Sequence, residues 1–174
     1  MRKKIFAFLL LSALYAGAQE VPDWENPIVV GINKEPYHAT LTLPSQKADC
    51  KEIISLNGKW RFQWSADPGK RPADFYKNDF NTDTWDTIIV PGAWQLQGYG
   101  KPIYSNVNYP FQKDAPKVTS EPPAEYYSYG HRNPTGSYVT TFEVTPDMKD
   151  KCLYLHFEGV KSAMYVWVNG ERVG

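Results

Sequence analysis

Residues 59–64 alternate between polar and aromatic side chains, and this two-residue period constrains the fold more than any other feature of the chain. Trp60, Phe62 and Trp64 lie on one face of an extended backbone, and the polar residues between them lie on the other. Such an alternation predicts a strand that is buried on one face only. We therefore expect an antiparallel sheet with one face against a core and one face in water.

Further strands are predicted from similar patterns, and no long stretch shows a helical period. They are expected at Ile88–Val90, Ser137–Val144, Cys152–Glu158 and Ala163–Val168. Asn169-Gly170 follows, flanked by short β-prone segments, and this dipeptide is typical of a tight β-hairpin. The pattern predicts an all-β chain, an antiparallel β-sandwich of the jelly-roll kind.

The first 18 residues have the pattern of a secretory signal peptide. Three basic residues from Arg2 to Lys4 precede an apolar stretch from Ile5 to Tyr15, and Ala16-Gly17-Ala18 is a small-residue cleavage site. The apolar stretch is too short for an ordinary membrane span, which needs about 20 residues. Cleavage after Ala18 removes three of 19 basic residues and none of 19 acidic ones, which changes the net charge from 0 to −3. We expect a periplasmic or extracellular protein with no membrane span after cleavage.

The mature chain divides into two regions. Residues 19–52 are polar and interrupted by prolines, so we expect an extended N-terminal arm. Residues 53–174 carry the predicted strands. The second strand of the predicted hairpin has only four residues before Gly174, so the sandwich is expected to be incomplete and the chain to be the front piece of a longer protein.

Composition excludes several classes of function. A chain of 174 residues is too short for a complete (β/α)8 barrel, which needs roughly 250. A net charge of 0 argues against a nucleic-acid partner. No phosphate-binding loop, dinucleotide fingerprint, serine-nucleophile elbow or metal-ligand spacing is present. The sequence itself therefore predicts no catalytic residue and no metal site.

The two cysteines, Cys50 and Cys152, leave two possibilities open. An oxidising compartment would allow them to pair, and a bridge closing about 100 residues contributes on the order of 4–5 kcal/mol in the chain-entropy model. They could equally remain free thiols, because Cys50 lies in the irregular arm.

Several motifs resemble the N-terminal sugar-binding region of glycoside hydrolase family 2. They occur in the order of the family and cover roughly residues 20–174: Leu56–Phe62, Val90–Gln95, Asn133–Tyr138, Phe157–Val160 and Val168–Gly174. Two further segments, Asp23–Pro27 and Gly98–Pro110, are similar to the large bacterial β-galactosidases within that family. The resemblance implies a galactose-binding-like jelly-roll sandwich preceded by an arm.

The resemblance also implies a role for one loop, Tyr104–Pro110. In the family, the Asn at the position of Asn106 contacts the galactosyl group, and the neighbour at Val107 lines the same subsite. An Asn amide can donate to and accept from sugar hydroxyls without adding a charge. The alternative is that Asn106 is only a turn residue. Trp60, Phe62, Trp64 and Trp167 could form a sugar-stacking platform, although their alternation on strands favours core packing.

The implied parent protein is a secreted β-galactosidase that hydrolyses terminal β-D-galactosyl residues with retention. Its two catalytic glutamates lie in a downstream barrel domain, with Mg²⁺ and Na⁺ nearby in many members, so this chain alone is expected to be inactive and to hold no cofactor. The complete protein is expected to form a homo-oligomer. Two alternatives remain: a stand-alone carbohydrate-binding module or lectin, and a family 2 β-glucuronidase or β-mannosidase.

Overall fold

The described part of the chain is built from antiparallel strands and short 3₁₀ helices. A computed structural model of the protein describes residues 21–37, 53–102, 113–118, 120–121, 124–125, 130 and 133–174. Strands β1 (Gly58–Ser65), β2 (Asp86–Val90) and β3 (Thr135–Val139) form one sheet in the order β2-β1-β3. Strands β4 (Trp167–Val168) and β5 (Glu171–Arg172) form a second, two-stranded sheet. The predicted all-β antiparallel fold class is confirmed.

Of the 3₁₀ helices in the described residues, the first lies in the arm before β1 and the others lie in the connections between strands. They are η1 (Asp23–Glu25), η3 (Pro68–Lys70), η4 (Trp94–Gln97) and η6 (Pro146–Met148). Each has three or four residues, as expected for this tight helix type. Nothing among them has the length and apolar character needed to cross a membrane, in the part of the chain that is described.

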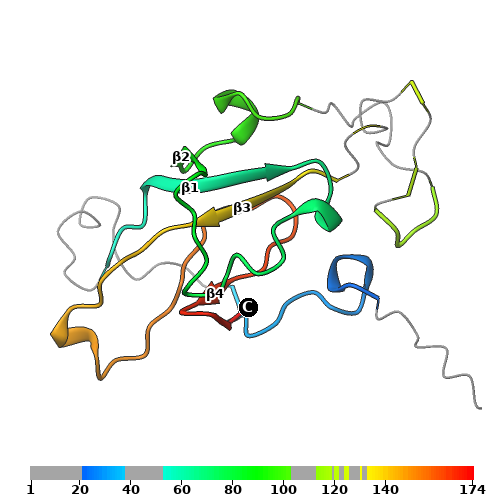
Figure 1. Ribbon diagram of the computed structural model, residues 1–174. Coiled ribbons are helices and arrows are strands. Elements are labelled where there is room, and N and C mark those ends of the chain that lie inside the picture. The colour runs from blue at the N-terminus through cyan, green and yellow to red at the C-terminus, as the bar shows by residue number, and fades with distance from the viewer. Residues whose placement is uncertain are drawn as a thin grey trace, which may run out of the picture.

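Strand β1 is the centre of the larger sheet, and its alternation matches the prediction. Phe62 is fully buried, whereas Lys59 and Arg61 are exposed. The register places Phe62 between Asp86 of β2 and Tyr138 of β3. Figure 1 shows β1 and β3 side by side along most of their lengths.

The inner face of this sheet packs against an aromatic cluster. The ring of Phe62 lies 4.7 Å from that of Tyr138, 4.8 Å from that of Tyr99 and 6.2 Å from that of Trp94. Gly136 lies beside them, and a Cβ there would come within 2.8 Å of ring atoms of Phe62 and Tyr138. These contacts favour core packing over a sugar-stacking platform for Phe62.

A second aromatic cluster connects the β4–β5 hairpin to the segment before β2. Tyr76 stacks on Trp167 at 5.2 Å with an interplanar angle of 10°, and Phe75 contacts both Trp167 and Trp85. The hairpin turn has positive φ at Asn169 (51°) and Gly170 (88°), the requirement of a type I′ turn. The predicted Asn-Gly hairpin is therefore confirmed, and the second cluster attaches it to the segment before β2.

Three predicted strands are shorter in the structure or absent. Ser137–Val144 is a strand only up to Val139, and Ala163–Val168 only at Trp167–Val168. The strand predicted over Cys152–Glu158 is wrong, because this segment is not in either sheet. Its apolar side chains remain exposed, 54% at Leu153 and 41% at Phe157. Alternation supplies a face to bury, but a strand also needs a ladder partner, and no described segment pairs with this one.

The described part of the arm, residues 21–37, contains η1 and no strand. It lies near the β4–β5 hairpin and Gly174, as the blue and red segments in Figure 1 show. The side chain of Asn33 donates to the carbonyl of Val173 at 2.8 Å. Cys152 is an exposed thiol without a disulfide partner among the described residues, and Cys50 lies outside them.

Candidate functional site

The two predicted sugar-contacting residues, Asn106 and Val107, lie outside the described residues. The structure therefore shows only the chain that leads into their loop, up to Pro102, and the chain that leaves it, from Lys113. The contacts of the segment that leads into the loop determine how firmly the start of the loop is fixed.

The entry to the loop is anchored on the core of β1. After η4 the chain turns at Gly98 (φ 97°) and Gly100 (φ 63°), and the ring of Tyr99 between them packs against Phe62. Burial, with a smaller effect of the neighbouring Asp86 carboxylate, raises the pKa of Tyr99. A Cβ at Gly100 would lie 3.3 Å from the indole nitrogen of Trp64. Positive φ explains both glycines, and the close approach of Trp64 is a second reason at Gly100.

Gln97 attaches η4 to the free edge of β2. Its side-chain oxygen accepts from the backbone N–H of Ile89 at 2.8 Å, and its side-chain nitrogen donates to the Ile89 carbonyl at 3.0 Å. The amide thus pairs with the strand edge as a neighbouring strand would. It fixes η4, and with it the entry to the loop, against the sheet.

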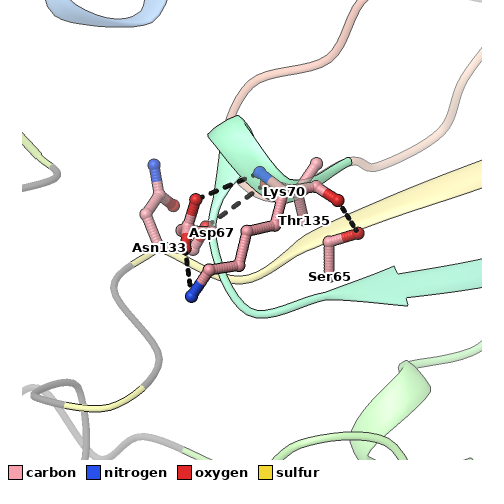
Figure 2. A network of polar contacts seen from close by, with 5 residues as sticks. All are labelled: Ser65, Asp67, Lys70, Asn133 and Thr135. Carbon is pink, nitrogen blue, oxygen red and sulfur yellow. Dashed lines mark hydrogen bonds and ion pairs between the residues drawn. The ribbon is translucent and has the colours of Figure 1, made fainter. Parts of the chain in front are cut away.

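A polar network at the C-terminal end of β1 stabilises the turn that follows the strand (Figure 2). Asp67 accepts from the backbone N–H of Lys70 at 3.2 Å and pairs with its ammonium at 3.1 Å. The hydroxyl of Ser65, opposite Thr135 in the register, donates to the Lys70 carbonyl at 3.4 Å. These groups satisfy one another within the turn that follows β1, so the network is structural.

The arm is held to the hairpin by one carboxylate. Arg172 of β5 donates to Asp23 Oδ2 at 2.6 Å, and the hydroxyl of Tyr165 donates to the same oxygen at 2.9 Å. Chiefly the Arg172 hydrogen bond, and then that of Tyr165, lowers the pKa of Asp23. Desolvation and then the Asp23 contact raise the pKa of Tyr165. We call Asp23, Tyr165 and Arg172 the arm clamp.

The residues next to Asp23 extend this attachment. The ring of Trp24 lies 5.9 Å from that of Tyr165, and the Arg71 guanidinium lies 5.7 Å from the Trp24 ring. Glu25 accepts from the backbone N–H of Val118 at 3.1 Å. The motif Asp23–Pro27, singled out in the sequence, thus contacts three segments far away along the chain. Sequence patterns contain no signal for these partners.

The outer face of the larger sheet carries a shallow groove of about 370 Å³. It was not predicted, although the polar side of β1 was visible in the alternation. Polar residues make up six of the eight that line it. The lining comes from all three strands and their flanks: Lys59, Trp60, Arg61, Thr82, Thr87, Val139, Thr140 and Thr141.

Among the described residues, no three His, Cys, Asp or Glu side chains gather where they could hold a metal ion. Asp23, for example, already accepts hydrogen bonds from Arg172 and Tyr165 at one carboxylate oxygen.

Comparison with known proteins assigns the region that contains both sheets to a protein family. Residues 53–174 match the family model described as "Glycosyl hydrolases family 2, sugar binding domain". The chain is 40% identical over 169 residues to a beta-galactosidase of Priestia megaterium, with 91% of this chain and 16% of that protein covered. It is 38% identical over 152 residues to one of Halalkalibacterium halodurans (84% and 14% covered). It is 41% identical over 159 residues to one of Clostridium acetobutylicum (87% and 17% covered).

Proposed function

Since the chain belongs to glycosyl hydrolase family 2 through its sugar-binding domain, we propose that it serves as that domain in a β-galactosidase. The single observation that carries the proposal is the similarity to beta-galactosidases at 38–41% identity over 84–91% of the chain. The chain spans only 14–17% of the length of these relatives. The proposed reaction is hydrolysis of terminal β-D-galactosyl residues with retention.

Retaining hydrolysis needs two carboxyl groups about 5–5.5 Å apart, one as nucleophile and one as acid and base. In our proposal both belong to a barrel domain of the longer protein. This chain contributes the loop that contains Asn106 and Val107, which contact the galactosyl group. The packing of Tyr99 on Phe62 and the pairing of Gln97 with β2 support this role, because they give the loop a fixed base.

Replacing Asn106 tests the loop and the activity together. In the full-length protein, Asn106→Ala should lower kcat/KM for a β-galactoside roughly three- to tenfold, the effect of losing one neutral hydrogen bond to the substrate. Asn108→Ala, in the same loop, is the matched control and should leave kcat/KM unchanged. Equal kinetics for the Asn106 variant and the wild type would contradict the assignment.

The same assay separates the alternatives. A preference for a β-glucuronide or β-mannoside would show that the protein is a family 2 enzyme with a substrate other than the proposed one. Galactoside binding without turnover by the full-length protein would favour a carbohydrate-binding module or lectin. Oligomer formation and a requirement for Mg²⁺ or Na⁺ stay predictions, and the same preparation can be tested for both.

We further propose secretion, on the basis of the N-terminal pattern alone. The basic residues Arg2–Lys4, the apolar stretch and Ala16-Gly17-Ala18 support it. The protein recovered from the periplasm or medium should begin at Gln19 when its N-terminus is sequenced. Recovery of the protein in the cytoplasm with residues 1–18 still attached would contradict this proposal.

A further inference from the structure

The outer face of the β2-β1-β3 sheet presents a groove with an uncommon combination of side chains. The register sets Arg61 between Thr87 of β2 and Val139 of β3, and Lys59 two pairs further along β1, opposite Ile89. Both cations therefore project on the same side of the sheet. Thr82, Thr140 and Thr141 complete the lining with hydroxyl groups.

Neither cation in the groove pairs with a carboxylate within the described ranges. Lys59 makes no ion pair there, and Arg61 makes one hydrogen bond, from Nη1 to the carbonyl of Trp85 at 3.4 Å. That long bond uses one N–H group and leaves the others of the Arg61 guanidinium available. A guanidinium with free donors suits a planar or tetrahedral anion, which it can hold through two parallel hydrogen bonds.

The remaining lining suits a sugar. Threonine hydroxyls donate and accept, as sugar hydroxyls do, so each can pair with a ring hydroxyl. The groove volume of about 370 Å³ lies in the range of small-molecule sites. Charge and hydroxyl groups together fit a ligand that has both an anionic group and several hydroxyls.

We propose that this groove binds an acidic saccharide, whose sulfate or carboxylate contacts Lys59 and Arg61 and whose hydroxyls contact the threonines. The saccharide class rests on the proposed function, whereas the need for an anion rests on the groove. None of the lining residues of the groove belongs to the predicted loop of Asn106. A nucleic acid fits less well, because two cations on a chain of net charge 0 provide little counterion release.

The binding test uses the full-length protein and matched ligands. A sulfated galacto-oligosaccharide, its desulfated counterpart and a uronate-containing oligosaccharide are titrated by calorimetry, with a short oligonucleotide as a fourth ligand. We expect at least one of the two acidic saccharides to bind more tightly than the desulfated one. That preference should weaken as salt screens the cations.

Substitutions in the groove then locate the site. Lys59→Gln and Arg61→Gln should each weaken binding of the acidic saccharide roughly three- to tenfold, the effect of losing one charge-assisted contact at an exposed site. Lys149→Gln, which removes the same charge from an exposed position outside the groove, should not. Arg61→Lys keeps the charge, and thermal melting of every variant checks that the fold is intact.

Two readouts separate this inference from the proposed function. Turnover of a small neutral β-galactoside should be the same for Lys59→Gln and the wild type. If the protein binds the acidic saccharide but hydrolyses no galactoside, the proposed function is wrong and the proposed binding site in the groove is still supported. Three results would overturn the proposal that the groove binds an acidic saccharide. They are equal binding of sulfated, uronate-containing and desulfated ligands, no effect of Lys59→Gln on binding by a folded protein, and a preference for the oligonucleotide.

Discussion

At the scale of single residues, Asp23 shows how one carboxylate can organise a segment without regular structure. It accepts from Arg172 and Tyr165 at 2.6 and 2.9 Å, and the Arg172 guanidinium also lies 4.2 Å from the Tyr165 ring. The three groups therefore form a closed set of contacts. Since Asp23 lies 149 residues before Arg172, the clamp ties the start of the described chain to its end.

The arm clamp should make stability depend on pH in a defined direction. The folded-state pKa of Asp23 is lowered below its ordinary value of 3.8, chiefly by Arg172. Its stabilisation is therefore fully present above that ordinary value and is lost as the pH falls through the lowered one. Asp23→Asn should lower the melting temperature at neutral pH, and the difference from the wild type should shrink in acid.

Thermal unfolding monitored between neutral and acidic pH measures this effect. Asp150→Asn is the control, because Asp150 is exposed and the substitution removes the same charge outside the clamp. A difference between Asp23→Asn and the wild type that stays constant with pH would show that the ion pair with Arg172 is not its cause.

At the scale of elements, β2 has one free edge, and η4 covers part of it. Among the described residues, β2 pairs with β1 on one side and with no strand on the other, so its other backbone groups need partners or water. Gln97 provides both a donor and an acceptor to Ile89. One side chain thereby stabilises the strand and positions the helix, and the segment leading to Asn106 follows directly from Gly98.

Removing this pairing should destabilise the domain moderately. Gln97→Ala loses two hydrogen bonds at a partly exposed site, which corresponds to about 1–2 kcal/mol in the free energy of unfolding. Urea denaturation measures it, and Gln95→Ala on the same 3₁₀ helix is the matched control, expected within about 0.5 kcal/mol of the wild type. An equal loss in both variants would mean that helix propensity, and not the pairing with Ile89, is responsible.

At the scale of the whole molecule, aromatic side chains do most of the packing. The cluster around Phe62 covers the inner face of the larger sheet, and the cluster of Tyr76 and Trp167 attaches the hairpin. Few apolar side chains in the described ranges are fully enclosed; the buried ones are Phe62, Trp85, Ile88 and Met148. The segment from Leu153 to Met164, with its apolar side chains exposed, remains outside this core.

Local sequence patterns predicted the features that depend only on residues close together along the chain. The alternation in β1 identified its buried face, and Asn169-Gly170 identified the hairpin, because period and turn chemistry act over a few residues. The same reasoning failed for Cys152–Glu158, where alternation is present but no described strand pairs with it. The predicted loop residues Asn106 and Val107 lie outside the described residues and stay predictions.

The sequence by itself determined the all-β class, the polar and apolar faces of β1 and the family to which the chain belongs, because each depends on residue order along the chain. Only the tertiary structure decided which distant groups meet: Asp23 with Arg172, Gln97 with Ile89, and Lys59 and Arg61 with the threonines of the groove. The two named hydrogen-bonded contacts join residues 8 and 149 positions apart, and the groove brings three strands together. Such proximity is set by packing and strand register, which no local pattern contains.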